Sequence, residues 1–218
     1  MRHPVGAVLA ANYEIQSVLG RGAFGVVYRA KDVLAGREVA IKALRQSDLS
    51  DQSDLIWEIQ KLAQLAIPNV LAFYHHFTES GALYLVTEFC SGGSLADELA
   101  RARLNEADAT KIAIKLSIAL SRVHEAGIVH HDIKPENILF NGDGEPRLAD
   151  FGVANRHAGT VTYMAPEQFL GEAVALDDPR IDVYALSLTL LEMCTSTRPF
   201  KGLSREEVLQ AKLTQSFV

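Results

Sequence analysis

The segment from residue 20 to residue 27 has three glycines at a fixed spacing, in the order GRGAFGVV. Glycines spaced in this way let backbone N–H groups approach phosphate oxygens, because no Cβ stands between them. Dinucleotide-binding folds contain a similar run, but there the glycines open a helix. Here Val26, Val27 and Tyr28 continue in a pattern that predicts a strand. An ordinary β-turn is the alternative, and this segment alone leaves both interpretations open.

Lys42 ends the next apolar segment, Val39-Ala40-Ile41-Lys42, which also predicts a strand. A lysine inside an apolar strand is unfavourable unless its ammonium group has a partner. Nucleotide phosphates are one candidate partner, and the carboxylate of Glu58, on the helix predicted to follow, is another. A solvent-facing lysine is the alternative, and it is the commoner position for a single lysine.

A third cluster, HHDIKPEN at residues 130–137, places a carboxylate, an ammonium group and an amide at positions i, i+2 and i+5. The tripeptide Asp150-Phe151-Gly152 follows, and Ala165-Pro166-Glu167 comes after it. Five separated motifs in this order resemble the eukaryotic-type protein kinases, and the local sequence is most similar to the bacterial serine/threonine kinases. The resemblance extends from about Tyr13 to Ala211.

The resemblance implies an α+β fold with two lobes. The smaller N-lobe, residues 13–89, would be an antiparallel β-sheet with one main helix. A hinge at residues 90–93 would connect it to a mostly helical C-lobe, residues 94–218. We therefore expect residues 1–218 to form a single protein kinase domain that is incomplete at its C-terminus.

The resemblance also assigns catalytic roles. Phosphoryl transfer depends mainly on positioning and on neutralising charge. Asp132 would orient the substrate hydroxyl and accept its proton, and Lys134 would face the γ-phosphate of ATP. Asn137 and Asp150 would hold Mg²⁺. Thr160 matches a threonine that packs against the catalytic loop and faces the substrate residue.

The nucleotide site is expected to come mainly from the N-lobe. Gly20, Gly22 and Gly25 would cover the ATP phosphates, and Lys42 would hold two of them while Glu58 holds Lys42; Asp54 is a poorer alternative to Glu58. The residues expected around the adenine are Leu19, Val27, Ala40, Thr87, Glu88, Phe89, Cys90 and Leu139.

Two further groups have structural alternatives. Asp182 matches a buried aspartate that anchors the backbone of the catalytic loop, and a helix N-cap is the alternative. A stack of apolar side chains that assembles in active kinases would contain Leu62, Phe73, His130 and Phe151. Ordinary core packing accounts for the same residues, and both interpretations can hold together.

The elements that must position these residues follow from periodicity. Alternation of apolar and polar residues predicts strands over 13–20, 25–32, 37–45, 70–79 and 82–89, with a turn at Ser80-Gly81. Helical spacing predicts a helix over 55–66, a second helix capped by Asn105 that stops at Gly127, and a third over 179–195. The third is apolar nearly all round, which predicts a central position in its lobe.

Three features depart from the family pattern. His131 stands where most members have an arginine that pairs with a phosphate on the activation loop. The stretch from Val153 to Met164 has only 12 residues, and its only hydroxyls are at its end. We therefore expect activity without phosphorylation of this loop. The sequence stops at Val218, where family members continue with further helices, so a missing segment or a partner chain is expected to cover part of the C-lobe.

Composition excludes several other classes. With 218 residues, 48% hydrophobic and 22% charged, the chain is neither disordered nor collagenous. A net charge of −6 speaks against nucleic-acid binding, and two cysteines are too few for a disulfide scaffold. No apolar run reaches the roughly 18 residues of a membrane span, and no secretory signal is evident. We therefore expect a cytoplasmic protein.

The leading functional hypothesis is an ATP- and Mg²⁺-dependent kinase that phosphorylates serine or threonine in proteins. A pseudokinase or nucleotide-binding scaffold with little turnover is the alternative, favoured by the short loop and opposed by the intact Lys42, Asp132, Asn137 and Asp150. A small-molecule kinase is disfavoured, because residues 159–167 resemble a peptide-docking segment.

Overall fold

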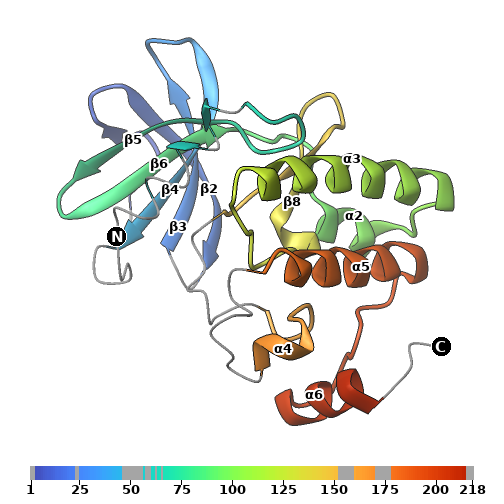
Figure 1. The fold of residues 1–218 in the computed structure, drawn as a ribbon. Coiled ribbons are helices and arrows are strands. Elements are labelled where there is room, and N and C mark those ends of the chain that lie inside the picture. Colours follow the sequence, from blue (N-terminus) through green and yellow to red (C-terminus); the bar gives the residue numbers. More distant parts are fainter. Residues whose placement is uncertain are drawn as a thin grey trace. The chain divides into compact units, whose positions relative to one another are not determined.

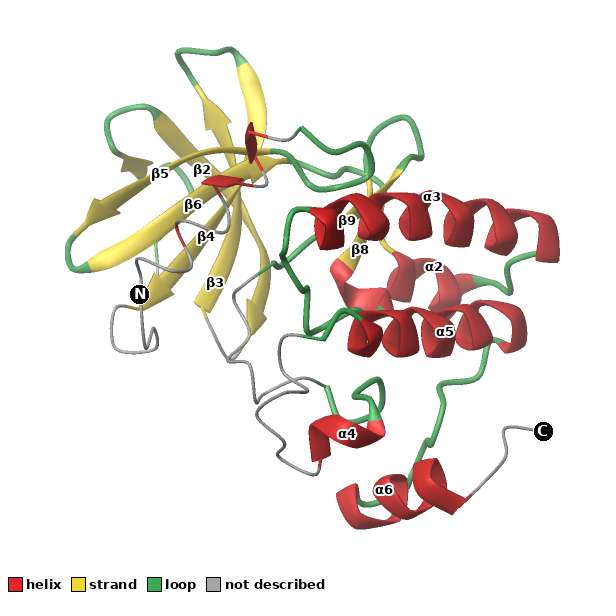
Figure 2. Ribbon diagram, viewed as in Figure 1, coloured by secondary structure: helices red, strands yellow, loops and turns green. Residues whose placement is uncertain are grey.

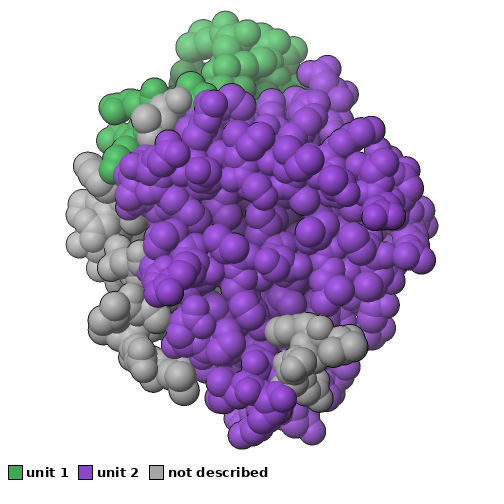
Figure 3. Space-filling model, turned by 45° about the vertical axis from the view of Figure 1, so that its right-hand side comes forward, with its two compact units in different colours: residues 1–66, 71–91 green, residues 67–70, 92–218 purple. Residues whose placement is uncertain are grey.

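The computed structural model describes residues 3–22, 25–45, 56, 60–61, 63–64, 66–151, 160–169 and 178–214. The chain forms two compact units, coloured separately in Figure 3: Met1–Ala66 with Leu71–Ser91, and Ile67–Val70 with Gly92–Val218. The first unit is built on a β-sheet and the second is mainly helical (Figure 2), so the fold is α+β as expected. Within the described ranges, no helix combines the length and the apolar character needed to cross a bilayer.

The first unit has a six-stranded antiparallel sheet in the order β1-β2-β3-β4-β6-β5 (Figure 1). Its strands are β1 (Val8–Leu9), β2 (Tyr13–Gly22), β3 (Gly25–Asp32), β4 (Arg37–Arg45), β5 (Phe73–Glu79) and β6 (Ala82–Glu88). The predicted bounds of β3 and β4 are confirmed, whereas β5 begins three residues later than the prediction and β1 was not predicted. Ser80 and Gly81, both with positive φ, make the turn between β5 and β6.

The two faces of this sheet differ in character. One face forms a buried core cluster that consists of Leu9, Tyr13, Ile15, Tyr28, Ala30, Val39, Ile41, Ala43, Ala82, Tyr84 and Val86. Residues directly opposite each other on neighbouring strands share a face, and side chains alternate along each strand. Since Ile41 and Ala43 belong to the core face, Lys42 between them lies on the other one, where it is half-buried.

The predicted helix over residues 55–66 lies largely outside the described residues. The described members of this stretch, Ile56, Gln60, Lys61, Ala63 and Gln64, are helical. Residues 67–70 belong to the second unit although they precede the predicted hinge. The reason is pairing: Leu148 N donates to Asn69 O at 2.8 Å, and Asn69 Nδ2 donates to Pro146 O at 2.9 Å.

The second unit contains a small sheet and a set of helices. Its strands are β7 (Gly93–Ser94), β8 (Ile138–Phe140) and β9 (Pro146–Leu148), none of which was predicted. Its helices are α2 (Leu95–Arg101), α3 (Glu106–Glu125), the 3-10 helix η2 (Pro135–Asn137), α4 (Pro166–Phe169), α5 (Arg180–Thr195) and α6 (Arg205–Thr214). Helix α3 packs against α5, and α4 against α6 (Figure 1).

Local signals in the sequence account for the ends of α3. The Asn105 side chain accepts a hydrogen bond from the backbone of Asp108, which confirms the predicted N-cap. Gly127 has φ of 72° just after the last turn, a conformation that suits glycine and ends the helix.

Helix α5 is only partly enclosed. Ile181, Ala185 and Leu188 are buried, as a central helix requires. Val183 and Leu191, however, are 54% and 42% exposed. The helix is therefore buried on one side and carries apolar side chains in solvent on another, so the predicted central position holds for one side of the helix only.

Candidate active site

Asp182 anchors the loop that follows α3. Its carboxylate is 1% exposed and accepts hydrogen bonds from the backbone nitrogens of His130 and His131, at 2.8 and 2.9 Å. His124 Nε2, on α3, lies 2.8 Å from Oδ2 of the same group. The predicted anchoring role of Asp182 is confirmed, and the alternative of an N-cap is wrong because Asp182 lies inside the first turn of α5.

Burial alone would raise the pKa of Asp182, since desolvation disfavours the charged form. The hydrogen bond from His124, the charge of His130 and the two backbone N–H groups outweigh burial and hold that pKa below its ordinary value. Asp182 is therefore an ionised acceptor at neutral pH, fixed by three donors from α3 and the loop. Sequence reasoning missed His124, because nothing in the sequence pairs a histidine of one helix with an acid of another.

The anchored loop has unusual backbone conformations. His131 has φ of 71° and Asp150 has φ of 67°, both in the left-handed region that residues with a Cβ rarely adopt. Such conformations persist only where surrounding contacts impose them, and they are common at active sites. At His131 the hydrogen bond to Asp182 is one such contact.

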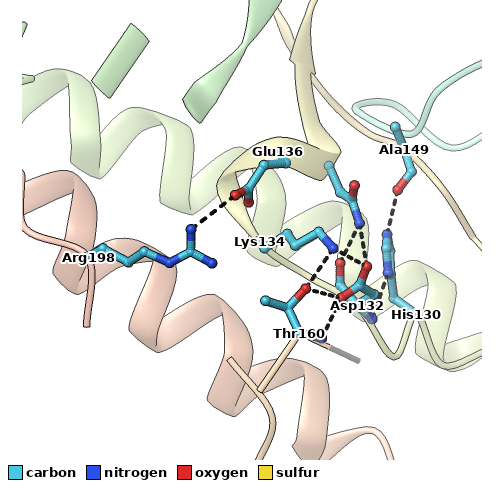
Figure 4. A network of polar contacts seen from close by, with 8 residues as sticks. His130, Asp132, Lys134, Glu136, Ala149, Thr160 and Arg198 are labelled. Carbon is cyan, nitrogen blue, oxygen red and sulfur yellow. Dashed lines mark hydrogen bonds and ion pairs between the residues drawn. The ribbon is translucent and has the colours of Figure 1, made fainter. Parts of the chain in front are cut away.

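Asp132 is at the centre of a polar cluster, shown in Figure 4. Lys134 Nζ donates to Asp132 Oδ2 at 2.6 Å and to Thr160 Oγ1 at 2.7 Å. The Thr160 backbone nitrogen and hydroxyl donate to Asp132 Oδ1 at 3.1 and 3.2 Å. Asn137 Nδ2 donates to the carbonyl oxygen of Asp132 at 2.8 Å and to its Oδ2 at 3.0 Å. The structure thus brings together Asp132, Lys134, Asn137 and Thr160.

The electrostatics of this cluster favour a charged carboxylate. Burial by itself would raise the pKa of Asp132. The hydrogen bond and the charge of Lys134, the N–H of Thr160 and the charge of His130 outweigh burial and lower that pKa. Asp132 is therefore ionised at neutral pH and can accept hydrogen bonds.

Asp150 and Phe151 are attached to the same loop. Ala149 N donates to Asn137 O at 2.9 Å, and the Ala149 carbonyl lies 2.9 Å from His130 Nε2. The rings of His130 and Phe151 have their centroids 4.3 Å apart, and both side chains are buried. Two of the four residues of the predicted apolar stack are thus in contact, and the exposed Asp150 lies between Ala149 and Phe151 in the chain.

A second polar group lies beside η2. Arg198 Nη1 is 3.6 Å from Glu136 Oε1, and both side chains are 44% exposed (Figure 4). The Arg198 guanidinium lies 5.8 Å from the centroid of the Tyr163 ring. The Tyr163 hydroxyl donates to Glu192 Oε2 at 2.5 Å, and its pKa is raised by burial and by that carboxylate. Arg198 and Glu192 were not among the predicted site residues.

The first unit positions the predicted nucleotide residues of the sheet. Val27 lies opposite Lys42, and Ala40 lies opposite Thr87, so these four residues share the face that is not the core cluster. Gly20 lies opposite Val27, and Gly22 opposite Gly25. The glycine run is therefore flanked by strands, as predicted, and not by a helix.

Gly25 is required by the sheet itself. Its φ is 149°, and a Cβ at this position would lie 1.9 Å from the carbonyl oxygen of Ala43. Only glycine fits there, whatever role its N–H has toward a phosphate.

The remaining predicted adenine residues are distributed over both units. In the first, Leu19 is exposed, Glu88 N donates to Ala72 O, Phe89 lies under the Arg29 guanidinium, and Cys90 is half-buried. In the second, Leu139 is in β8, opposite Arg147. Glu58, Leu62 and Gly152 lie outside the described residues. The convergence of Lys42 with Asp132, Asn137 and Asp150 stays a prediction.

Comparison with known proteins identifies the family. A family model described as a protein kinase domain matches residues 13–218. The Aurora kinase of Schizosaccharomyces pombe is 36% identical over 204 residues, which are 88% of this chain and 57% of that protein. Serine/threonine-protein kinase PrkC of Bacillus subtilis is 34% identical over 214 residues, 91% of this chain and 32% of that protein. Serine/threonine-protein kinase KIC1 of Saccharomyces cerevisiae is 36% identical over 195 residues, 84% of this chain and 18% of that protein.

The chain thus spans between 18% and 57% of the length of these relatives. The matched region includes the anchored loop, the Asp132 cluster and the glycine run of β2 and β3. With nearly all of its length matched by the family model, the chain belongs to the protein kinase domain family.

Proposed function

We propose that this chain transfers the γ-phosphate of ATP to serine or threonine hydroxyls of protein substrates. The observation that carries the proposal is the cluster in which Asp132, Lys134 and Thr160 are joined by hydrogen bonds of 2.6 to 3.2 Å. Relatives whose names identify them as serine/threonine-protein kinases support the choice of hydroxyl.

Asp132 would orient the substrate hydroxyl and accept its proton. Its lowered pKa keeps it ionised, so it accepts the hydrogen bond before transfer and takes the proton only as the new P–O bond forms. A lysine ammonium has three N–H donors, and Lys134 directs two of them to Asp132 and Thr160. The third would go to an oxygen of the transferred phosphoryl group.

The donor set fits Mg²⁺, which prefers carboxylate, amide and phosphate oxygens. The Asn137 amide nitrogen donates to two oxygens of Asp132, which leaves its Oδ1 as an acceptor on the opposite side of the amide. Asp150 is exposed and follows Ala149, whose backbone is hydrogen-bonded to Asn137. These two side chains would hold the ion, which supplies charge neutralisation to the phosphates when bound.

The first unit would hold the nucleotide. Val27, Ala40, Lys42 and Thr87 share one face of its sheet, which supports a common role for them. We propose that the adenine lies against Val27, Ala40 and Thr87 and that Lys42 holds phosphate oxygens. Glu58 remains the proposed partner of Lys42.

The decisive experiment measures transfer of the γ-phosphate of ATP to a generic basic protein. Wild type should transfer phosphate with Mg²⁺ and lose transfer on chelation. Asp132→Asn should lower the rate by about 10²- to 10⁴-fold, because the general base is lost. Nucleotide binding without transfer by wild type would overturn the proposal in favour of the scaffold alternative.

We further propose that turnover does not require phosphorylation of the stretch from Val153 to Met164. Two features support this proposal: His131 stands where most family members have the arginine that pairs with a phosphate on this loop, and the stretch has only 12 residues. Phosphatase treatment should therefore leave the rate unchanged. A stoichiometric phosphate in this stretch, found by mass spectrometry and needed for turnover, would contradict the hypothesis. The cytoplasmic location and the absence of nucleic-acid partners stay predictions from composition.

A further inference from the structure

Lys212 is a buried cation that the proposed mechanism does not use. It lies near the end of α6 and is 7% exposed. Its Nζ donates to the carbonyl oxygens of Val161 and Thr162, at 3.0 and 2.9 Å, and also to the carbonyl oxygen of Met164. The three donors of one ammonium group are thus directed at three acceptors of a single five-residue segment, Thr160–Met164.

Aromatic rings enclose the same ammonium group. Nζ lies 5.3 Å from the ring centroids of Phe169 and Tyr184 and 5.2 Å from that of Phe200. The faces of aromatic rings attract cations, most strongly where water is excluded. Three carbonyls and three rings therefore replace the water that Lys212 loses on burial. In the described part of the chain, its hydrogen-bond partners are all backbone oxygens.

The segment Thr160–Met164 is held from two sides. On one side, the N–H of Thr160 donates to Asp132. Within the segment, the N–H groups of Tyr163 and Met164 donate to the Thr160 carbonyl. On the other side, the carbonyls of Val161, Thr162 and Met164 accept from Lys212. The segment belongs to no helix or strand, so its carbonyl oxygens have no N–H donors from secondary structure. Lys212 supplies the hydrogen-bond donors for three of them.

A purely structural role in core packing would not need a lysine. A methionine fills a similar volume, and burying it carries no desolvation penalty. The ammonium group of Lys212 instead binds the segment whose first residue, Thr160, contacts both Asp132 and Lys134. The carbonyls that Lys212 binds, at residues 161, 162 and 164, follow Thr160 directly in the chain.

We propose that Lys212 is a positioning residue that holds Thr160–Met164 in the conformation in which Thr160 completes the Asp132 cluster and a protein substrate docks. The inference rests on the proposed function, because it assigns Lys212 to the substrate side of that reaction. It assigns no part in nucleotide binding to Lys212.

The test compares Lys212→Met with Lys212→Arg and with Lys201→Met. Lys212→Met keeps the aliphatic chain and removes the donors, Lys212→Arg keeps a cation with N–H donors, and Lys201 is an exposed lysine that serves as the matched control. For a serine or threonine peptide, Lys212→Met should lower kcat/KM by about 10- to 100-fold, while the KM for ATP stays within about twofold. Lys212→Arg should recover most of the loss, and Lys201→Met should match wild type.

Amide hydrogen exchange is a second measurement, and it does not require that the protein transfers phosphate. In Lys212→Met the amides of Thr160, Tyr163 and Met164 should exchange faster than in wild type, while those of α3 should not change. If wild type transfers no phosphate, the proposed function fails, and exchange alone decides the role of Lys212. Unchanged exchange and peptide kinetics in Lys212→Met would overturn the inference. The inference would also be overturned if Lys212→Met lowered kcat/KM equally for peptide and for ATP, in step with a lowered melting temperature.

Discussion

The Oδ2 atom of Asp182 lies 2.8 Å from the backbone nitrogen of His130, although 52 residues separate the two in the chain. Asp182→Ala removes the buried acceptor of this N–H, of the His131 N–H and of His124. We expect the free energy of unfolding to fall by about 3–5 kcal/mol, measured by urea denaturation. The exposed Asp143 provides a control: Asp143→Ala should stay within about 0.5 kcal/mol of wild type.

The same carboxylate predicts how stability responds to acid. The pKa of Asp182 in the folded chain is below its ordinary value of 3.8, so the folded state binds fewer protons than the unfolded state at acidic pH. The contribution of Asp182 to stability is present above pH 3.8 and is lost as the pH falls through the folded pKa. The difference in unfolding free energy between wild type and Asp182→Asn should therefore shrink below pH 3.8. A difference that grows there would contradict the assignment.

The hydroxyl of Thr160 is hydrogen-bonded both to Asp132, the proposed base, and to Lys134. Thr160→Val keeps the shape and the backbone hydrogen bond to Asp132 but removes the two hydrogen bonds of the hydroxyl, with Asp132 and with Lys134. We expect kcat to fall by roughly 10- to 100-fold, because hydrogen bonds to charged groups contribute about 1.5–3 kcal/mol each. Thr160→Ser, which retains the hydroxyl, should stay within a few-fold of wild type. Equal losses in both variants would mean that the methyl group, and not the hydroxyl, is what the site requires.

The ion pair between Glu136 and Arg198 predicts a change in peptide preference. Arg198→Ala leaves the charge of Glu136 uncompensated beside the catalytic loop. Compared with wild type, this variant should favour a peptide with an arginine near its serine over the alanine-substituted peptide by about two- to fivefold, the range of an exposed ion pair. Adding Glu136→Ala should remove the new preference. If the preference persists in the double variant, another acid carries it.

Lys212 predicts an alkaline limit to peptide phosphorylation. Burial lowers the pKa of Lys212 to about 8, and the neutral amine above that pH has only two hydrogens for three carbonyls. The ring of Tyr184 lies 5.3 Å from Nζ, and its pKa is raised to about 12 by burial, so Tyr184 does not titrate in this window. The value of kcat/KM for the peptide should fall above pH 8 in wild type and stay level in Lys212→Arg.

This alkaline loss would not be due to unfolding. Since the folded pKa of Lys212 lies below 10.5, its value in the unfolded chain, the folded state releases the proton first. Between pH 8 and 10.5 this titration increases the free energy of unfolding. A melting temperature that holds or rises while the rate falls would separate the two effects. A rate and a melting temperature that fall together would contradict the explanation.

Periodic patterns predicted the larger elements well. Strands β3 and β4 alternate over eight and nine residues, long enough for a period of two to be evident, and their bounds were correct. Strands β1 and β7 have two residues each, too few to show any period. They form because longer neighbours offer hydrogen-bonding edges, and a local pattern does not contain that information.

The site was predictable where its residues lie close together in the sequence. Asp132, Lys134 and Asn137 come from one loop and one turn of 3-10 helix, so their spacing determines their proximity. The partners that come from distant elements were not predictable in this way. Lys212 and His124 are single charged or polar residues on helices, and such residues usually face water. Only the packing of α6 against α4, and of α3 against α5, gives them buried partners.

The backbone at His131 also constrains which residues a saturation library would recover at that position. At φ of 71°, glycine and asparagine fit readily, whereas valine and isoleucine, with branched Cβ atoms, are excluded whatever their chemistry. Histidine and arginine both have an unbranched Cβ, and histidine is among the residues that adopt positive φ more often than most. His131→Arg therefore keeps an unbranched Cβ at this backbone torsion while it introduces a longer, permanently charged guanidinium group next to Asp132 in the chain.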